Sequence, residues 1–511
     1  MQRNFSKLSS GGKFDVLIIG GGITGAWAAY DAARRGLHVA LVEKSDWASG
    51  TSSASSKMIH GGLRYLATYE FGLVKHSLEE RALLARLAPH LIRPVRFALP
   101  IYKTDDVTRL QMKAGLTMYD WFATRKSPAP KHEYLSKKKY AKRYPYIRQE
   151  GLVGGFTYGD CQEDDARMTV EIVWGADFTG ATCVNHCRAT ELLREGEKVV
   201  GATLRDELTG EETDVYARTV VNAAGPWCES LLPSGGKSRL TRLVKGVHLM
   251  MPSLPLQKHG YADGMLITNP DDGRVVFLIP WYGYTILGTT DSDYEGSPDA
   301  LGVTVEEEDY LLDIANKALA QVPGAKHWQR KDICGSYAGV RTLENAEGKS
   351  ASKVSREWAL TEPLPNMLMP IGGKYTTARE DASFIVDKVV KKLGVEAPEC
   401  TTGKRPFPWA PLAGGAEGYK AWEKQAIADL EKAGVEAAIA KTVARRQGNQ
   451  LPVLLDLIAA DASLAERVDP AAPFIKAEAK KAKLYEMAVS DEDVYRRRMP
   501  LTLLTAGSSN A

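Results

Sequence analysis

The stretch FDVLIIGGGITGAWAAYDAARRGLHVALVEK, residues 14–44, decides the fold of this chain. Its first apolar run predicts a buried parallel strand, the Ala-rich segment that follows predicts a helix, and Val39–Val42 predicts a second strand. Between the first strand and the helix, Gly20, Gly22 and Gly25 have G-x-G-x-x-G spacing. Such glycines let backbone amides approach a pyrophosphate at a helix N-terminus, where the helix dipole favours anions.

An acidic residue after the second strand completes this pattern. Glu43 stands where a carboxylate accepts hydrogen bonds from the ribose of an adenine dinucleotide. A glycine triplet alone is weak support, since a glycine-rich turn can serve packing only. Strand, helix, strand and acid together predict a dinucleotide-binding unit. The residues of this unit that we expect to contact the dinucleotide are Gly20, Gly22, Ile23, Thr24, Gly25, Glu43 and Lys44.

The composition is that of an ordinary globular protein. The chain has 511 residues, 44% hydrophobic and 25% charged, with a formal net charge of +3, and its length predicts roughly two to four domains. The mild charge does not indicate nucleic acid, and we expect none. Six cysteines form no disulfide framework and fit a reducing compartment. No apolar run approaches the ~18 residues of a membrane span, and a secretory signal is not expected.

One short motif raises the question of a metal. Cys183, His186 and Cys187 have a spacing that occurs in zinc sites, but such a site needs a second ligand pair and none follows. We therefore expect no metal ion.

The chain divides into a nucleotide-binding part, a second part and a helical tail. Alternation of apolar and polar residues with turn signals predicts antiparallel sheet over 240–330, which suits a substrate domain. The tail carries no catalytic motif and is interpreted as a packing or assembly domain, with a homodimer as the candidate assembly. The nucleotide-binding domain is expected to cover 13–85, 151–239 and 331–396, the substrate or cap domain 86–150 and 240–330, and the linker with the helical domain 397–511.

Two further segments suit contact with a flat, polar cofactor. Residues 49–57 read SGTSSASSK, and hydroxyls and amides in such a loop pair with phosphate and ribityl oxygens. The apolar residues that follow tie the loop down, which disfavours a mobile surface loop. Residues 220–227, VVNAAGPW, form an apolar strand ending at small residues that allow close backbone packing. The expected contacts here are Thr51, Ser52, Ser53, Ser55, Ser56, Lys57, His60, Gly61, Gly62, Leu63, Ala224, Gly225 and Trp227.

Several segments, in order along nearly the whole chain, resemble the flavin-dependent glycerol-3-phosphate dehydrogenases. They include TSSASSKMIHGGLRYL (51–66), LVKGVHLMMP (243–252), YAGVRTL (337–343), IGGKYTTARE (371–380) and IKAEAKKAKLYEMAVSDEDVYRRR (475–498). The resemblance implies an α/β fold: a Rossmann-like FAD-binding domain of the glutathione-reductase or amino-acid-oxidase type, a mixed antiparallel-sheet substrate domain and a helical C-terminal domain. FAD is expected to bind non-covalently. The chain departs from the family at Thr342, where a proline is usual, and at Met58 and Tyr375.

The same resemblance implies oxidation of sn-glycerol 3-phosphate to dihydroxyacetone phosphate, with a hydride passing from C2 to the flavin. Guanidinium groups match a phosphate dianion, because they are always charged and offer a planar fork. We assign Arg341 and Arg356 to the phosphate, with Arg64 beside them and Tyr65 as a hydroxyl donor, and Arg341 is counted with the catalytic residues. The ordinary alternative for each arginine is a surface or structural ion pair.

The reaction also needs a base and a group that stabilises the reduced flavin. An imidazole with a pKa near 6.5 can accept the alcohol proton; His248 is the first choice, and His60 is expected to touch the flavin. A hydrogen-bonded structural histidine is the alternative for each. A strand-to-helix turn offers a helix N-terminus and an ammonium to the flavin and the substrate, although simple capping would explain it too. Its residues are Gly373, Lys374, Thr376 and Thr377.

The electrons need an acceptor. Because no second G-x-G-x-x-G and no cysteine cluster appear, a quinone is expected, as the resemblance also implies. The rival interpretations are an oxidase that passes electrons to dioxygen, an amine or amino-acid oxidase on the same fold, and a catalytically silent flavoprotein that serves as a binding module.

A basic segment next to apolar residues predicts docking on an anionic membrane surface, at the cytoplasmic face. Between residues 125 and 148, nine Lys or Arg residues stand against one acid, Glu133. A solvated charged face is the alternative. The basic residues are 125, 126, 131, 137, 138, 139, 142, 143 and 148, and the apolar edge is expected to comprise Leu110, Met112, Leu116, Met118, Trp121 and Phe122.

Overall fold

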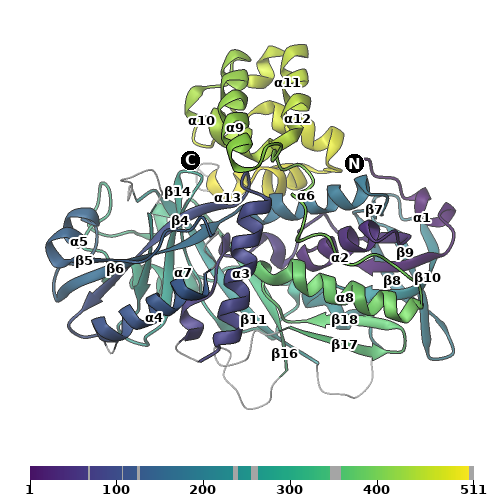
Figure 1. Ribbon diagram of the computed structural model, residues 1–511, viewed down its shortest axis with the longest axis horizontal. Coiled ribbons are helices and arrows are strands. Elements are labelled where there is room, and N and C mark those ends of the chain that lie inside the picture. The colour runs from purple at the N-terminus through teal and green to yellow at the C-terminus, as the bar shows by residue number, and fades with distance from the viewer. Residues whose placement is uncertain are drawn as a thin grey trace.

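The structure is a computed structural model in which two sheets lie side by side and a helical domain stands on them (Figure 1). It describes residues 1–66, 69–105, 107–123, 127–233, 240–254, 263–345 and 358–505.

Three parallel strands form the centre of the first sheet: two come from residues 14–44, and the third is β10 (Glu212–Asn222). β1 (Phe14–Ile19) pairs in parallel with β2 (Val39–Val42) on one side and with β10 on the other. Between β1 and β2 the chain forms α2 (Ile23–Arg34), so the predicted strand, helix and strand are confirmed. The strands that complete this sheet are β7 (Thr182–Val184), β8 (Cys187–Glu195), β9 (Lys198–Asp206), β17 (Ala359–Leu364) and β18 (Met367–Ile371).

Helices cover the apolar strands of this sheet. α2 packs against α6 (Asp165–Phe178) and α8 (Ala378–Leu393), and the core between helices and sheet is made of aliphatic and aromatic side chains such as Ile18 and Trp27. Burial on both sides explains why β1 and β2 are almost continuously apolar in sequence. The short α1 (Ser6–Ser10) precedes β1.

The second sheet contains the predicted antiparallel strands. β11 (Thr241–Pro252) pairs antiparallel with β14 (Tyr284–Gly288), which pairs with β13 (Val275–Trp281) across a tight turn at Tyr282 and Gly283. The other strands are β3 (Met58–Ile59), β4 (Arg93–Tyr102), β5 (Glu133–Ser136), β6 (Leu152–Gln162), β12 (Asp263–Thr268), β15 (Ser292–Asp293) and β16 (Gly335–Glu344), and the helices around it are α3 (Phe71–Leu87), α4 (Arg109–Phe122), α5 (Lys137–Arg143) and α7 (Val305–Ala318).

Three strands from ranges assigned by sequence to the nucleotide-binding domain lie in the second sheet. β3 pairs with β6, β6 with β4 and β16 with β11. A run of apolar residues predicts a strand, whereas its pairing partner is decided by tertiary contacts. The second sheet therefore reaches across the predicted domain boundaries, and β16 brings Arg341 to it.

The C-terminal residues form a helical domain with its own core, as expected. Its core includes Leu430, Ile439 and Leu454, and in Figure 1 its helices stand above the two sheets. No helix among the described residues has the length and apolar character needed to cross a bilayer. The domain comprises α9 (Gly415–Lys432), α10 (Ala437–Gln447), α11 (Leu451–Ala460), α12 (Lys476–Tyr485), the π-helix η10 (Asp493–Arg498) and α13 (Leu501–Thr505).

We predict that a methyl group at Gly25 disrupts the contact between α2 and β1. A Cβ there would lie 1.9 Å from the carbonyl oxygen of Gly20, so we expect Gly25→Ala to lower the free energy of unfolding by about 1–3 kcal/mol. Gly72 in α3 is the matched control, because a Cβ at that position would lie in open space, with nothing within 4 Å, and alanine favours a helix by up to about 1 kcal/mol. Urea unfolding of both variants tests this, and equal midpoints would contradict it.

Candidate active site

A cavity of about 1620 Å³ is lined by residues of both sheets. Its walls are the ends of β1 and β2, the loop 49–66, α4, β11, β16 and the turn before α8. Most residues expected from sequence to bind cofactor or substrate line it. These are Gly20, Gly22, Ile23, Thr24, Glu43, Lys44, Thr51, Ser52, Ser55, Ser56, His60, Gly62, Leu63, Arg64, Tyr65, Ala224, Gly225, Trp227, His248, Arg341, Gly373, Lys374 and Thr376.

The glycine turn forms a wall that is made of backbone. Gly20 has φ +114°, and a Cβ there would lie 2.4 Å from the carbonyl oxygen of Ala223. Gly22 occupies the N-cap of α2, so helix amides and the positive end of the helix dipole face the cavity. A side chain at Gly20 would clash with the backbone of Ala223 and distort this cradle. The turn therefore fits the pyrophosphate of a dinucleotide.

Glu43 is held in place by the glycine turn. Its carboxylate accepts hydrogen bonds from the backbone N–H groups of Gly21 at 2.7 Å and Ser45 at 2.9 Å. Burial raises the pKa of Glu43, and these two N–H groups oppose that rise. The carboxylate thus lies beside the pyrophosphate cradle, where a ribose-binding acid is expected.

Lys44 and Trp227 form a second cluster on the cavity wall. Lys44 Nζ lies 2.7 Å from a carboxylate oxygen of Asp299 and 3.8 Å from the centroid of the Trp227 ring. The indole N–H of Trp227 donates to the same carboxylate at 2.9 Å. Both residues line the cavity, as expected, but their polar groups already have protein partners.

Five residues expected to contact the cofactor are not among those that line the cavity. A hydroxyl-rich composition predicts a polar loop, but it does not tell which side chains of that loop face the cavity. Thr377 also makes no side-chain cap for α8, since its hydroxyl donates to Asp381 at 3.0 Å. The five residues are Gly25, Ser53, Lys57, Gly61 and Thr377.

Lys57 is the clearest of these corrections. Its side chain is 1% exposed and its Nζ lies 2.6 Å from Asp165, whose side chain is fully buried. The same ammonium donates to the carbonyl oxygen of Ser53 at 2.6 Å. Burial lowers the pKa of Lys57, and the carboxylate of Asp165 opposes this. Lys57 therefore stabilises the loop 49–57 through buried contacts with Asp165 and Ser53, and it does not line the cavity.

His248 and Arg341 lie on neighbouring strands and both line the cavity. In the pairing of β11 with β16, His248 stands opposite Tyr337 and Gly246 opposite Gly339. A Cβ on Gly246 would lie 2.8 Å from Nη2 of Arg341, so the absence of a side chain lets the guanidinium lie over the strand. Side chains two residues apart on a strand share a face. The register therefore brings both predicted residues to one face of the sheet.

Arg341 and His248 have well-defined partners. Nη1 of Arg341 lies 3.1 Å from Asp291. Nε2 of His248 lies 2.8 Å from the Ser56 hydroxyl, and its ring stacks on Tyr337 with centroids 4.7 Å apart. Its Nδ1 has no hydrogen-bond partner among the described residues. Burial, with the charges of Arg341 and Lys57, lowers the pKa of His248 well below its usual value, so the imidazole is neutral at neutral pH.

Tyr65 lies between two further cations. Lys374 Nζ lies 4.1 Å and the Arg64 guanidinium 5.2 Å from the centroid of its ring. The backbone N–H of His60 donates to the hydroxyl of Thr376 at 3.2 Å, which joins the loop to the turn before α8. Arg356, the remaining arginine assigned to the phosphate, lies outside the described residues.

Some residues of the site were not predicted from sequence. Tyr337 supports the imidazole, and Asp291 orients Arg341. Both lie in segments that match the family, GTTDSDYEG (288–296) and YAGVRTL (337–343). The family motifs therefore included both residues. Residue type alone does not show that this tyrosine stacks on an imidazole or that this aspartate orients an arginine.

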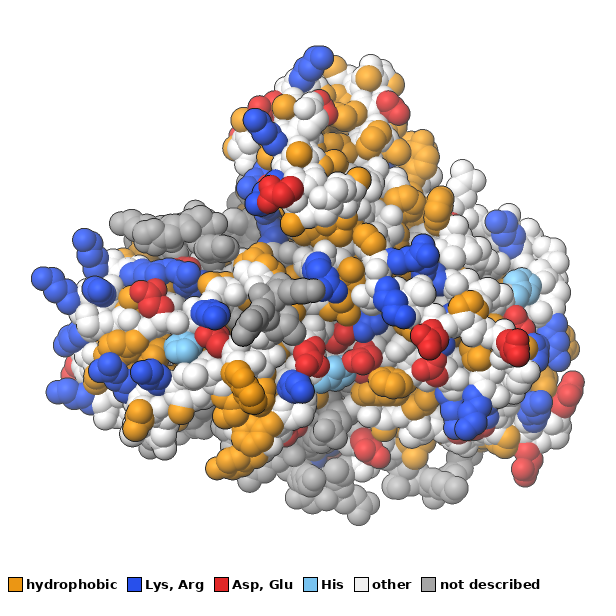
Figure 2. Space-filling model, in the orientation of Figure 1, with side chains coloured by type: hydrophobic (Ala, Val, Ile, Leu, Met, Phe, Trp, Pro, Cys, Tyr) orange, Lys and Arg blue, Asp and Glu red, His pale blue; other side chains and the backbone are white. Residues whose placement is uncertain are grey.

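The surface beside the cavity is less basic than expected. Arg143 makes an ion pair with Asp263 at 2.8 Å, and Arg148 lines the cavity. Leu116 is buried, whereas Leu110 and Trp121 of α4 are 77% and 78% exposed. Figure 2 shows Lys and Arg side chains gathered at the end of the molecule that carries α5. Residues 125 and 126 lie outside the described residues, and the exposed cations are Lys131, Lys137, Lys138, Lys139 and Lys142.

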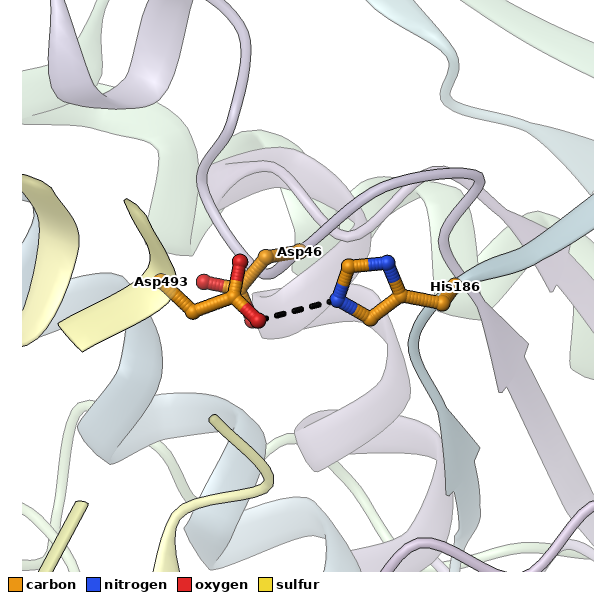
Figure 3. Close-up of side chains that lie close together, drawn as sticks. All are labelled: Asp46, His186 and Asp493. Atoms are coloured by element: carbon orange, nitrogen blue, oxygen red, sulfur yellow. Dashed lines mark hydrogen bonds and ion pairs between the residues drawn. The ribbon is translucent and has the colours of Figure 1, made fainter. Parts of the chain in front are cut away.

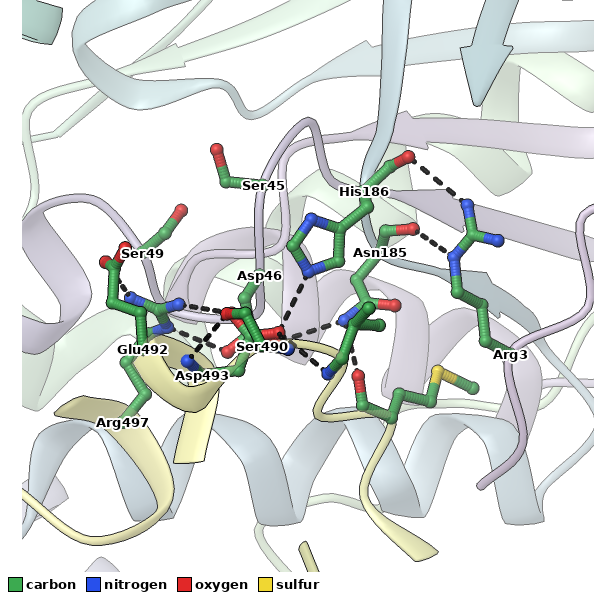
Figure 4. A network of polar contacts seen from close by, with 12 residues as sticks. Arg3, Ser45, Asp46, Ser49, Asn185, His186, Ser490, Glu492, Asp493 and Arg497 are labelled. Carbon is green, nitrogen blue, oxygen red and sulfur yellow. Dashed lines mark hydrogen bonds and ion pairs between the residues drawn. The ribbon is translucent and has the colours of Figure 1, made fainter. Parts of the chain in front are cut away.

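One cluster has the residue types of a metal site. Asp46, His186 and Asp493 each place a ligand atom within 4.8 Å of the others (Figure 3). However, Arg497 donates to Asp46 at 2.7 Å and to Asp493 at 2.5 Å, so a guanidinium already compensates both carboxylates (Figure 4). Cys187 of the sequence motif is not in the cluster, and burial raises the pKa of its thiol to about 12. The arrangement is that of an ion-pair network.

The parallel strands of the first sheet end in a glycine cradle, which opens onto a cavity shared with the largely antiparallel second sheet, and this arrangement fits a flavin-dependent oxidoreductase. Residues 15–377 match the family model described as FAD dependent oxidoreductase, and residues 409–511 match the C-terminal domain of alpha-glycerophosphate oxidase. The chain belongs to the FAD-dependent glycerol-3-phosphate dehydrogenases. The family, the fold class and the FAD cofactor expected from sequence are thus confirmed.

Individual relatives agree with this assignment. The chain is 36% identical over 454 residues to the aerobic glycerol-3-phosphate dehydrogenase of Staphylococcus haemolyticus, covering 87% of this chain and 80% of that protein. It is 34% identical over 523 residues to the glycerol-3-phosphate dehydrogenase of Synechocystis sp., covering 98% and 91%. The solved structure of the glycerol-3-phosphate dehydrogenase from Bacillus halodurans complexed with FAD superposes with a TM-score of 0.78 at 30% identity, covering 99% and 89%.

The two lysines of the cofactor region are expected to differ in their effect on stability. Lys57→Met leaves the buried carboxylate of Asp165 without its cation, which costs about 3–5 kcal/mol of unfolding free energy. Lys44→Met is the matched control, because its partner Asp299 is 65% exposed and such pairs contribute about 1 kcal/mol or less. Urea unfolding of the FAD-loaded variants measures both. A Lys57→Met variant as stable as Lys44→Met would show that the buried pair is not structural.

Proposed function

We propose that this protein oxidises sn-glycerol 3-phosphate to dihydroxyacetone phosphate and passes the electrons to a membrane quinone. Bound FAD supplies the acceptor for the hydride that leaves C2 of the substrate. The observation that carries the proposal is a shared cavity: Arg64, Arg341 and Lys374 line it together with a neutral His248 and the glycine cradle. The names of the relatives support the same substrate.

The cations of the cavity suit a phosphate ester. Arg341 offers a planar fork that Asp291 orients, and Arg64 and Lys374, which lie close to the Tyr65 ring, add charge to the same cavity. A doubly charged phosphate gains from several cations, whereas the carboxylate of an amino acid needs one arginine. The site therefore favours a phosphorylated alcohol over the substrates of amine or amino-acid oxidases.

His248 is the base of the proposed reaction. Its lowered pKa keeps the imidazole unprotonated and able to accept the hydroxyl proton as the hydride leaves. The bond to Ser56 and the stacking on Tyr337 fix the orientation of the ring. The products are the ketone, the protonated imidazole and the two-electron-reduced cofactor.

A quinone fits the apolar surroundings of α4 better than a soluble acceptor. Met112 and Leu116 of this helix line the cavity, while Leu110 and Trp121 on the same helix are exposed. Apolar side chains of α4 therefore run from the cavity wall to the surface. Peroxide release measured against quinone reduction distinguishes this acceptor from dioxygen, and stoichiometric peroxide with no quinone reduction would favour the oxidase.

We predict different kinetic effects for substitutions of Arg341 and His248. Arg341→Ala removes phosphate binding and should mainly raise KM, while His248→Ala removes proton transfer and should lower kcat about 10²–10⁴-fold. Anaerobic bleaching of the flavin band by glycerol 3-phosphate provides the measurement, with Arg341→Lys as the control that keeps the charge without the fork.

The pH dependence tests the same assignment. The base is active when neutral, that is, above its pKa, and the pKa of His248 is lowered. The acidic limb of kcat/KM should therefore lie below pH 6.5, the usual value for histidine, and His248→Ala should abolish it. Unaltered kinetics in Arg341→Ala and His248→Ala would contradict the proposed site.

We predict that the lysines of α5 bind the protein to anionic lipid. Lys137, Lys138 and Lys139 are exposed, and each cation near anionic lipid contributes about 1 kcal/mol. Reversing all three to Glu should abolish co-sedimentation with vesicles that contain anionic phospholipid. The matched control reverses three exposed lysines of α9, Lys420, Lys424 and Lys432. Equal binding by the two triple variants would contradict docking through α5.

A further inference from the structure

The C-terminal domain reaches the cofactor-binding loops through three consecutive arginines. At the end of η10, Arg498 donates to both carboxylate oxygens of Asp46, at 2.6 and 2.9 Å, and Arg497 donates to one of them at 2.7 Å. Asn185 donates to the other at 3.0 Å. Figure 4 shows Asp46 and Arg497 in this network, with η10 packed against the loop that carries Asp46.

Arg497 and Arg498 compensate the negative charge of Asp46, which is buried in the nucleotide-binding domain. The side chain of Asp46 is fully buried, and Arg497 and Arg498 are 5% and 1% exposed. A buried carboxylate without a cation is strongly destabilising. The conformation of the loop around Asp46 therefore depends on the C-terminal domain being docked.

The loop around Asp46 forms part of the FAD cradle. Trp47 packs so closely on Gly21 that a Cβ there would lie 2.4 Å from its ring, and the backbone N–H of Ala48 donates to the carbonyl oxygen of Gly21 at 3.0 Å. On either side of Asp46, Glu43 and Ser49 line the cavity. Holding Asp46 in place therefore also holds Trp47 and Ala48, the two residues that contact the glycine turn.

The third arginine holds the second cofactor loop. Nη2 of Arg496 donates to the carbonyl oxygen of Ser53 at 3.3 Å, and the ammonium of Lys57 donates to the same oxygen. The neighbouring Ser52 lines the cavity and accepts a hydrogen bond from the backbone N–H of Ile23 at 2.9 Å, in the first turn of α2. The arginines therefore contact both loops that follow β2.

We propose that Arg496, Arg497 and Arg498 form a clamp that positions the FAD-binding loops, so that docking of the C-terminal domain and binding of FAD strengthen each other. They are positioning residues: they contact the loops and not the reacting atoms. A coupling between two binding events is reciprocal and commonly amounts to about 5–150-fold in affinity. The proposal depends on FAD alone and not on the substrate or on the electron acceptor.

Affinity for FAD tests the clamp directly. Arg498→Lys keeps the charge but loses the fork, and Asp46→Asn removes the charge that the fork binds. In each variant, deflavinated and titrated with FAD, quenching of flavin fluorescence should give a Kd raised about tenfold or more. Arg446→Lys is the matched control, because Arg446 is equally buried and makes its bidentate ion pair with Glu478 inside the helical domain. A wild-type Kd in both clamp variants, or an equal loss in Arg446→Lys, would overturn the proposal.

The reciprocal effect can be measured on the unmodified protein, without any variant that has to fold. Hydrogen exchange of residues 486–498 should slow when FAD is added to the deflavinated full-length chain, whereas α9 should exchange at the same rate with and without FAD. Exchange in 486–498 that does not respond to FAD would show that the two parts are not coupled, and the clamp would be rejected.

Discussion

The site depends on backbone contact at the carboxyl ends of β1 and β10. There, the space that a Cβ of Gly20 would fill is taken by the carbonyl group of Ala223, and Gly25 lets α2 lie directly against the turn. Because no side chain separates these segments, helix amides and strand ends face one cavity. A single methyl group at Gly20 or Gly25 would push apart the elements that carry the cradle. Steric exclusion, more than any single attractive contact, thus sets the geometry in which the cofactor and the second sheet meet.

The two sheets make different contributions because of their different architectures. The parallel strands of the first sheet end in backbone donors and the carboxylate of Glu43, which suit a nucleotide. The antiparallel sheet projects side chains from adjacent strands onto one face, so the register of β11 with β16 brings His248 near Arg341. Desolvation and the guanidinium together keep that imidazole neutral. The same proximity that supplies charge for a phosphate therefore also keeps the base in the form that can accept a proton.

Local patterns in the sequence predicted the parts of this fold that depend on short-range periodicity. β1, α2, β2 and the main helices of the tail follow from apolar spacing and glycine positions, and family motifs indicated His248 and Arg341. Partners across the chain could not be predicted in this way. Lys57 and Lys44 both follow hydroxyl- or acid-containing cofactor segments, yet one is buried against Asp165 and the other lines the cavity. Likewise, the pattern of β6 specifies a strand without specifying its sheet. Burial and pairing arise from tertiary contacts that no window of sequence contains.

The C-terminal domain has no catalytic motif, but its charges are placed where the cofactor loops need them. Burying Asp46 without a cation would make its loop unstable, and among the described residues of the nucleotide-binding domain the side chain that donates to it is the neutral amide of Asn185. Arg497 and Arg498 provide the missing charge from a π-helix, a rare conformation that often marks functional sites. A buried ion pair contributes little net stability compared with apolar packing, while the loss of one partner is costly. Such a contact therefore favours one arrangement of the two domains over others. It adds little to the stability of either domain alone.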